Sequence, residues 1–200
     1  IANAAYDVRP EVMSPGHNFQ MPDGIVSRAI CGVSGLLPSD LCKEAGLVKT
    51  DLFNAKFAPT KVDDSLQKVD YVLIDDQPYV AIENTPKEFT FNGVMIKEEY
   101  LETYRLSESL QNQLSNVIPD RKAKHNGKQP SVVTNVSLSG STLSWAKQNE
   151  NDIVGYRIYQ APNGSDQFKL IASVKGNVTT SHNINSGSYA YYVTAVDVAG

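Results

Sequence analysis

The chain has 200 residues, of which 41% are hydrophobic and 20% are charged, the composition of an ordinary globular protein of one or two domains. Its net charge of -4 and isoelectric point near 5.4 argue against a nucleic acid partner and against electrostatic docking on an anionic membrane. No apolar run is long enough to span a membrane, and the chain does not open with a signal peptide.

Both cysteines, Cys31 and Cys42, lie in one short segment interrupted by the turn-forming residues Gly32, Gly35 and Pro38. Such a short loop closes readily. A cross-link there would stabilise the folded protein by about 3 kcal/mol, because it reduces the conformational entropy of the unfolded chain. The spacing is typical of neither a redox motif nor a zinc site. We therefore predict a Cys31–Cys42 disulfide, which would persist only outside the reducing cytosol. Two free thiols in a cytosolic protein are the alternative.

The segments that flank the cysteines carry a more specific signal. Residues 19–26 read FQMPDGIV, residues 34–37 read SGLL, and residues 51–59 read DLFNAKFAP. This order resembles the end of the transpeptidase domain in class A penicillin-binding proteins, the bifunctional peptidoglycan synthases of bacteria. Lys56 stands where the family usually has glycine, so the last motif departs from the pattern. The resemblance predicts that residues 1–64 are the tail of such a domain.

The resemblance also implies that the chain is a non-catalytic fragment of a longer enzyme. The family's Ser-x-x-Lys, Ser-x-Asn and Lys-Thr-Gly motifs, which activate the serine and bind the substrate carboxylate, lie N-terminal to the resembling segment. The parent enzyme would polymerise lipid-linked disaccharide and cross-link stem peptides outside the cell membrane. It would use no cofactor, and its membrane contact would be an N-terminal anchor.

Three short segments approach the catalytic motifs by chance. Residues 65–68 match Ser-x-x-Lys, residues 181–183 match Ser-x-Asn, and residues 49–51 read Lys-Thr-Asp in place of Lys-Thr-Gly. The third precedes the other two, which reverses the family order, and Asp51 replaces the glycine that lets the strand approach its ligand. We therefore expect no catalytic residue, and Ser65 in particular is not expected to be a nucleophile.

Residues 65–120 are predicted to form a hairpin followed by a helix. Residues 69–74 and 79–82 are rich in β-branched and aromatic side chains, and the turn residues 75–78 separate them. Apolar residues then recur at helical spacing over 97–118, until Pro119 ends the pattern. A hairpin is marginal alone, so we expect it to pack on this helix or on the absent part of the transpeptidase domain.

The remaining polar groups of this half do not predict a catalytic or metal site. The paired carboxylates Asp63–Asp64, Asp75–Asp76 and Glu98–Glu99 are expected to diverge into solvent. His17, His125 and His182 lie far apart in the sequence without ligand-spaced partners, so no metal is expected. Three sequons, at Asn135, Asn163 and Asn177, are expected to be idle in a bacterial protein.

Residues 131–200 are predicted to be a separate β-sandwich, which follows a polar linker at 121–130. Residues 141–145 read STLSW, residues 153–159 read IVGYRIY, and residues 187–197 read GSYAYYVTAVD. These segments resemble strands B, C and F of a fibronectin type III domain, an immunoglobulin-like fold. The chain ends where strand G would begin, so we expect an unpaired edge on strand F and a longer natural protein. The predicted fold is thus mainly β with some α.

The resemblance assigns roles to three aromatic residues of this domain, and strand alternation assigns roles to two more. Trp145, Tyr156 and Tyr189 are expected in the core, and Tyr189 is expected to bond to backbone at the turn before its strand. A sugar-stacking platform is the alternative reading of these rings. Tyr159 and Tyr192 point outward by strand alternation, which makes them candidate binding residues.

Three functions fit these patterns. The leading hypothesis is a brace and spacer in the C-terminal region of a Gram-positive class A penicillin-binding protein, on the outer face of the membrane or in the wall. Its partners would be the rest of the transpeptidase domain and, through the aromatic residues, peptidoglycan or division and elongation proteins. A module that binds wall polymer or a protein is the second hypothesis. An accessory region of a secreted carbohydrate-active enzyme is the third, and it requires a carboxylate pair that the sequence does not show.

Overall fold

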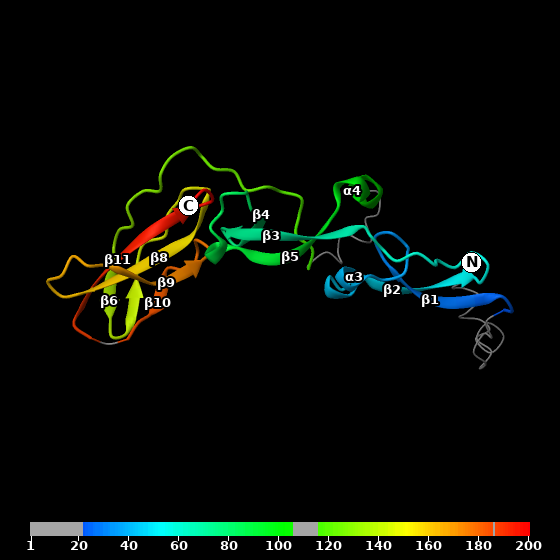
Figure 1. The fold of residues 1–200 in the computed structure, drawn as a ribbon, viewed down its shortest axis with the longest axis horizontal. Coiled ribbons are helices and arrows are strands. Elements are labelled where there is room, and N and C mark those ends of the chain that lie inside the picture. Colours follow the sequence, from blue (N-terminus) through cyan, green and yellow to red (C-terminus); the bar gives the residue numbers. More distant parts are fainter. Residues whose placement is uncertain (1–21, 106–115, 186) are drawn as a thin grey trace, which may run out of the picture.

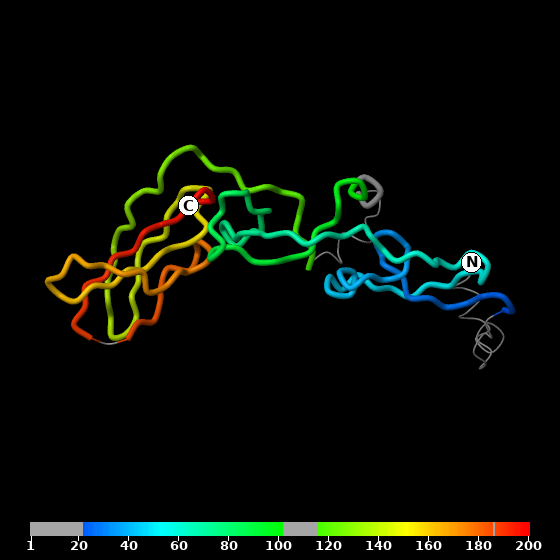
Figure 2. The backbone as a smooth tube through the Cα atoms, in the orientation of Figure 1, coloured from blue at the N-terminus to red at the C-terminus, as the bar shows by residue number. Residues whose placement is uncertain are grey.

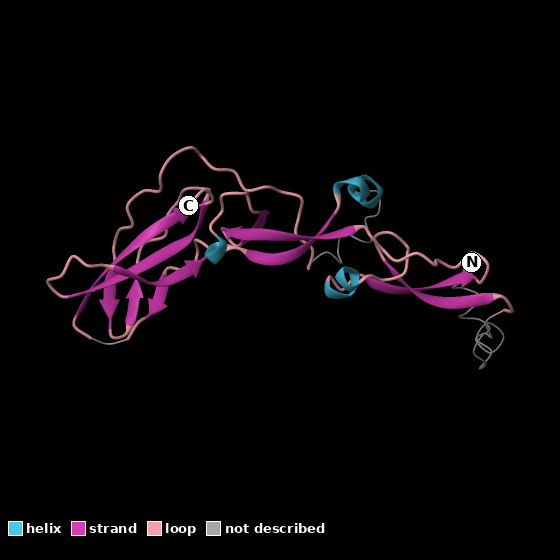
Figure 3. Cartoon of the chain, in the orientation of Figure 1, coloured by secondary structure: helices cyan, strands magenta, loops and turns pink. Residues whose placement is uncertain are grey.

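The computed structural model describes residues 22–105, 116–185 and 187–200, with the side chains of 102–105 left aside. The described chain is elongated, and a three-stranded sheet in its middle separates an N-terminal hairpin from a C-terminal pair of sheets (Figure 1). Strands dominate, and the two short α-helices lie near the junction between the hairpin and the middle sheet (Figure 3). The prediction of a mainly β fold with some α is confirmed. Within the described residues, no helix has the length and apolar character needed to cross a membrane.

The N-terminal hairpin pairs β1 (Ile25–Cys31) with β2 (Val48–Asn54) in antiparallel register. The register places Ile25 opposite Asn54 and Cys31 opposite Val48. Helix α3 (Asp40–Glu44) lies between the two strands in sequence. Most side chains of the two strands are exposed or half-buried, so this ribbon has little core of its own.

The middle sheet has the order β4-β3-β5, with β3 (Leu66–Ile74) at its centre. The predicted hairpin is present, because β3 turns at Asp75–Asp76 into β4 (Gln77–Val80). Both turn residues have positive φ, 51° and 58°, as a two-residue hairpin turn requires. The 3-10 helix η1 (Lys87–Phe89) and the third strand β5 (Phe91–Ile96) were not predicted.

Helix α4 (Glu98–Arg105) begins where the sequence pattern predicted it. Residues 106–115 of the predicted helix lie outside the described part of the chain. Its last turn is wrong, because Val117 forms a bridge with Val94 and the Ile118 N–H donates to the Val94 carbonyl at 2.8 Å. The apolar residues at 117 and 118 therefore keep the helical spacing, but their backbone is not helical and lies beside β5.

The C-terminal region contains two antiparallel three-stranded sheets. One has the order β10-β7-β6, and the other has the order β11-β8-β9. Their strands are β6 (Ser137–Ser139), β7 (Thr142–Ser144), β8 (Ile153–Pro162), β9 (Lys169–Lys175), β10 (Ser181–Asn183) and β11 (Tyr189–Asp197). The sheets share one core, in which Leu143 and Trp145 pack with residues of β8, β9 and β11. The short strand β10 was not predicted.

Residues 116–136 run as a long loop from the middle sheet to this sandwich (Figure 2). The part predicted to be a linker, 121–130, is attached to the middle sheet at its start. Lys122 forms a parallel bridge with Val80, and the buried Ala123 donates its N–H to the Val80 carbonyl at 2.9 Å. The connection is therefore packed against the protein at this point.

Candidate functional site

The predicted disulfide is present and forms the buried base of the N-terminal hairpin. Cys31 ends β1, Cys42 lies in α3, and their Cα atoms are 5.9 Å apart. Ser39 begins the helix because its hydroxyl accepts the Cys42 N–H at 3.2 Å. Both cysteines are fully buried and pack with Leu47 and Leu66. The cross-link thus closes the loop between β1 and β2 and packs against the first residue of β3.

A buried carboxylate, Asp63, organises the same region. Its oxygens accept the hydroxyls of Ser34 at 2.6 Å, Ser65 at 2.6 Å and Ser39 at 3.0 Å, while its exposed fraction is 6%. Burial alone would raise the pKa of this carboxyl, but the hydrogen bonds from Ser34, Ser65 and Ser39 outweigh it and lower the pKa below its usual value. The charged form is therefore the one that holds the loop closed.

Asp63 is a residue whose structural role the sequence did not predict. The prediction that Asp63 and Asp64 diverge into solvent is wrong for Asp63, whose carboxylate points at three hydroxyls. A local signal was present in the spacing Asp63-x-Ser65, because Asp63 also accepts the Ser65 backbone N–H at 3.2 Å. The other two serines are 24 and 29 residues away, so no local pattern revealed them.

The structure does not assemble the chance matches into a catalytic serine site. The Ser65 hydroxyl is buried and donates to Asp63, whereas the Lys68 amine forms an ion pair with Glu44. A serine nucleophile of this type requires the lysine beside its hydroxyl, and here each group has a different partner. The second match, residues 181–183, forms β10 in the sandwich, and the third, residues 49–51, lies in the hairpin strand β2.

A second buried cluster, which we call the joint, connects the middle sheet with the sandwich. Phe89 packs with Val72 and Ile74 from the middle sheet and with Val154 and Val196 from the sandwich. A side chain at Gly155 would have its Cβ 2.5 Å from the Phe89 ring and 2.2 Å from the Val174 carbonyl oxygen. Glycine at this position therefore lets the aromatic ring of one region lie directly on a strand of the other.

Polar contacts surround the apolar joint on several sides. Asn177, which is 1% exposed, accepts the Asp75 N–H at 2.7 Å and donates to the Asp75 carboxylate at 2.9 Å. That carboxylate also accepts Lys147 at 2.6 Å, and hydrogen bonds from Lys147 and then Asn177 lower its pKa. Asp75 thus joins the tip of the β3–β4 turn to the sandwich. Burial of Asn177 also removes this sequon from the surface.

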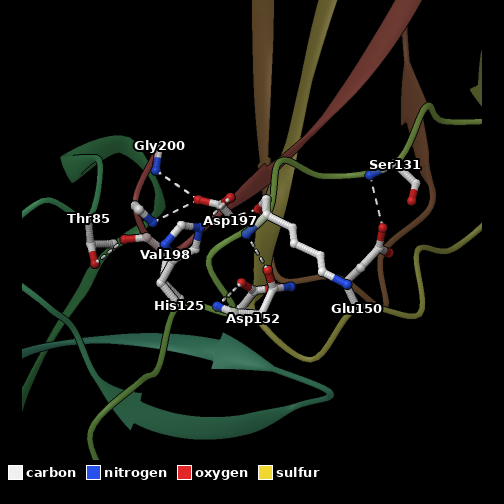
Figure 4. A network of polar contacts seen from close by, with 11 residues as sticks. Thr85, His125, Ser131, Glu150, Asp152, Asp197, Val198 and Gly200 are labelled. Carbon is white, nitrogen blue, oxygen red and sulfur yellow. Dashed lines mark hydrogen bonds and ion pairs between the residues drawn. The ribbon is translucent and has the colours of Figure 1, made fainter.

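The polar network of Figure 4 continues across the joint to the end of the chain. The Thr85 hydroxyl donates to the Val198 carbonyl at 2.9 Å, and the Asp197 carboxylate accepts the Ala199 and Gly200 N–H groups at 2.8 and 3.0 Å. His125 lies 3.3 Å from the same carboxylate through its Nε2. The last residues are therefore fixed between the sandwich and the middle region.

Metal ligation has two geometric candidates among the described residues. Cys31, Cys42 and Asp63 form one group, but its cysteines are consumed by the disulfide. The other group is His125 with the buried Asp152 and Asp197, which the fold brings together although their sequence positions have no ligand spacing. Asp152 already accepts two hydrogen bonds from Asn126, and Asp197 accepts the amides described above. Both carboxylates thus have structural roles within the protein.

The outward aromatic residues form a cluster on the face of the β11-β8-β9 sheet. Tyr159 and Tyr192 are cross-strand neighbours whose rings stack with centroids 4.7 Å apart and planes at 5°. Phe168 meets Tyr192 edge-on at 5.0 Å. Tyr192 is 41% exposed and Phe168 is 37% exposed. We call these three residues the aromatic cluster. Part of the surface of each ring is covered by its neighbour in the cluster.

The aromatic residues expected in the core are divided between two environments. Trp145 and Tyr156 are buried and meet edge-on at 5.3 Å. Tyr189 is 41% exposed, so its expected place in the core is wrong. The hydroxyl that bonds back to earlier backbone is that of Tyr191, which donates to the Asn185 carbonyl at 3.5 Å. The backbone contact expected of Tyr189 is thus made by a tyrosine two residues further along β11.

Residues 21–68 match the family model of the C-terminal domain of penicillin-binding protein 1A. The matched segment contains the hairpin β1–β2, the disulfide, α3 and Asp63, and it extends into the first residues of β3. It supports a penicillin-binding protein C-terminal region in this part of the chain. Such a family suggests the cell envelope, and the disulfide is in keeping with an extracytoplasmic compartment. Neither the curated proteins nor the solved structures gave a significant match.

Proposed function

We propose that this chain is the non-catalytic C-terminal portion of a Gram-positive class A penicillin-binding protein and that it acts as a brace and spacer in cell-wall synthesis. The parent would be a peptidoglycan glycosyltransferase and D,D-transpeptidase, working on the outer face of the membrane. The family match over residues 21–68 carries the proposal. The shape of the described chain supports a spacer, since three regions follow one another along its length (Figure 1).

The exposed hairpin supports a brace that docks on the rest of the parent enzyme. Leu52 is 58% exposed, Phe57 is 80% exposed and Val62 is 60% exposed, all within the segment that matches the family. A two-stranded ribbon gains little stability alone, so these exposed apolar side chains are available for contact with a partner. The remainder of the transpeptidase domain is the partner that we assign to this surface.

The arrangement of the C-terminal sandwich supports a fibronectin type III domain. Two three-stranded sheets enclose Trp145 and Tyr156, and β11 occupies an edge of its sheet. The joint makes this domain a rigid continuation of the middle sheet, because Phe89 and Val72 are buried together with Val154. A spacer needs this stiffness, which a flexible linker would not supply.

Paired measurements on the parent enzyme and on this chain test the brace. Leu52→Asp and Phe57→Asp are expected to lower the melting temperature of the parent's transpeptidase domain by several degrees. In the 200-residue chain the same changes should alter the unfolding free energy by less than about 0.5 kcal/mol, because these side chains are exposed there. Val132→Asp, at an 85% exposed position in the sandwich, is the control. Equal stability of parent and variants would refute the brace.

Fluorescent penicillin tests the non-catalytic assignment. We expect it to label the parent enzyme and to leave this chain unlabelled, because Ser65 and Lys68 have different partners. Labelling of the chain that Ser65→Ala abolished would overturn the assignment.

A second candidate function is binding of wall polymer or a protein through the aromatic cluster. The observation that favours it is an exposed face formed by Tyr159, Tyr192 and Phe168. Retention on purified insoluble cell wall at low salt, lost in Tyr192→Ala, would support it. Leu170→Ala, at a 50% exposed position of β9, is the matched control. No retention of the unchanged chain would leave the spacer role alone.

A further inference from the structure

A groove of about 320 Å³ lies at the tip of the sandwich, where the β8–β9 loop points away from the middle sheet (Figure 1). Its lining comes from the end of β8, from this loop, from β9 and from Tyr189 at the start of β11. Small-molecule sites have volumes of about 300–1,000 Å³, so the groove is at the lower end of that range. We call it the distal groove. None of its lining residues belongs to the joint or to the aromatic cluster.

Tyr189 gives the distal groove an aromatic ring that is held in place without being covered. A Cβ atom at Gly187 would lie 2.3 Å from this ring, so the ring lies directly against the backbone of Gly187. Tyr191 meets the ring edge-on, with centroids 6.4 Å apart. Tyr189 is nevertheless 41% exposed, and it lines the groove. The ring is therefore supported from behind and still offers aromatic surface to a ligand.

A bulge in β9 adds an aliphatic side chain to the same groove. Ile158 pairs with Ala172 and Tyr159 pairs with Leu170, so Ile171 has no partner in the ladder. Bulges redirect a side chain and are frequent at sheet edges and next to active sites. Ile171 is exposed and lines the groove. Its apolar surface is thus available to the same ligand as the Tyr189 ring.

Side-chain amides supply most of the polar lining. The Gln160 amide donates to the Tyr191 hydroxyl at 3.0 Å, and the Gln167 amide donates to Asp166 at 3.2 Å. Each amide is oriented by its nitrogen, and its carbonyl oxygen keeps the capacity to accept hydrogen bonds. The Ser165 hydroxyl accepts the Gln167 N–H at 3.1 Å and keeps its own proton to donate. The groove therefore combines acceptors and a donor with apolar surface.

This combination suits a neutral sugar ring. A pyranose has a face of C–H groups that packs on an aromatic ring, and it has a rim of hydroxyls that both donate and accept hydrogen bonds. A wholly apolar ligand would bury the amide oxygens without partners, which is unfavourable. An anionic ligand would meet a single cation in the lining, the exposed Lys169, with the Asp166 carboxylate beside the groove. A cationic ligand would meet no carboxylate in the described lining.

We propose that the distal groove binds one neutral pyranose unit of a glycan chain. The C–H face of the sugar packs on Tyr189, and its hydroxyls bind the amides of Gln160 and Gln167. The inference goes beyond the brace and spacer and does not rest on them, since neither role requires a ligand here. It also differs from binding through the aromatic cluster. Gln160 directly follows Tyr159 in β8, and neighbouring side chains of a strand point to opposite faces of the sheet.

Nuclear magnetic resonance of the isotope-labelled chain with soluble trisaccharides tests the proposal. The probes are cellotriose, which has hydroxyls alone, and triacetylchitotriose, which also carries acetamido groups, so the two arms distinguish plain from acetylated glycans. With at least one of them at millimolar concentration, we expect saturable shifts of the Gln160 and Gln167 side-chain amide signals. The Gln148 amide, which donates to Val132 elsewhere in the sandwich, should not shift. Absence of saturable shifts with both sugars would overturn the proposal.

Variants of the aromatic wall identify where the sugar binds. Tyr189→Ala should weaken binding about tenfold, because the stacked ring is lost, whereas Tyr189→Phe should bind normally. Gly187→Ala keeps the tyrosine but displaces its ring, so it should also weaken binding, and it replaces Tyr189→Ala if that variant does not fold. Tyr192→Ala, in the aromatic cluster, is the matched control and should bind normally. Binding that Tyr189→Ala and Gly187→Ala leave unchanged would overturn the proposal, as would binding that only Tyr192→Ala weakens.

Discussion

The two ends of strand β3 are held by different physical means. The first residue of β3, Leu66, packs on the disulfide. Close to it in sequence, the buried carboxylate of Asp63 accepts hydrogen bonds from three serine hydroxyls. At its last residues, Val72 and Ile74 enter the joint, where an aromatic ring and several valines are buried without a covalent link. A small region with little apolar surface needs a cross-link, whereas the larger interface is stabilised by burial itself.

This difference gives the two ends different sensitivities. The disulfide region should respond to reductant and acid, since its stability comes from a covalent bond and a charged group. The joint should respond to loss of side-chain volume. Because β3 belongs to both, we expect the unchanged chain to unfold in a single cooperative transition.

The largest effect is expected from Phe89→Ala. The ring is fully buried and bridges the middle sheet to Gly155 of the sandwich, so its loss should cost about 4 kcal/mol of unfolding free energy. Calorimetry should then show two separate thermal transitions in place of one. The control is Phe57→Ala, at an 80% exposed position, which should leave the single transition intact. One unchanged transition in Phe89→Ala would refute the joint as the coupling element.

Removal of the disulfide is expected to have the next largest effect. The double change Cys31→Ser and Cys42→Ser should lower stability by about 3 kcal/mol, because the unfolded chain regains the freedom of the closed loop. Guanidinium unfolding with and without reductant measures it, and the reductant should have no effect on the double variant. When the cysteine changes are combined with Phe89→Ala, we expect the loss of stability to appear in only one of the two unfolding transitions. An equal loss in both transitions would contradict the separation of the two ends.

Asp63→Asn should destabilise the same end by about 2 kcal/mol, since hydrogen bonds to a charged acceptor are lost. Hydrogen bonding lowers the pKa of Asp63 in the folded protein relative to the unfolded chain. Its contribution is therefore fully present above the unfolded pKa and is lost as pH falls below about 4. Unfolding free energies between pH 2.5 and 7 should show a flatter acid limb in the variant. An identical limb would remove Asp63 as the acid-sensitive group.

The sequence predicted those features whose partners are close together along the chain. The two cysteines are 11 positions apart, and the β3–β4 turn needs only Asp75 and Asp76, so local patterns revealed both. Features with distant partners were missed: Asn177 meets Asp75 across 102 residues, and Thr85 meets Val198 across 113. The polar composition of residues 121–130 was also misleading, because this predicted linker contains the buried Ala123. The predicted end of the helix over 97–118 was wrong, because the spacing of apolar residues alone cannot distinguish a helix from backbone that pairs with β5.

The ion pair between Arg157 and Glu88 should have the smallest effect. It crosses the joint with a 2.6 Å contact, and the guanidinium lies 5.6 Å from the centre of the Phe89 ring. The hydrogen bond from Arg157 lowers the pKa of Glu88, so its contribution is lost as pH falls below about 4.5. Glu88 is 41% exposed, and solvent screening should limit the cost of Glu88→Gln to below about 1 kcal/mol. Chemical unfolding at 50 mM and 1 M salt should show this small loss shrinking with salt. A loss as large as that of Phe89→Ala would mean that charge, and not apolar burial, holds the joint together.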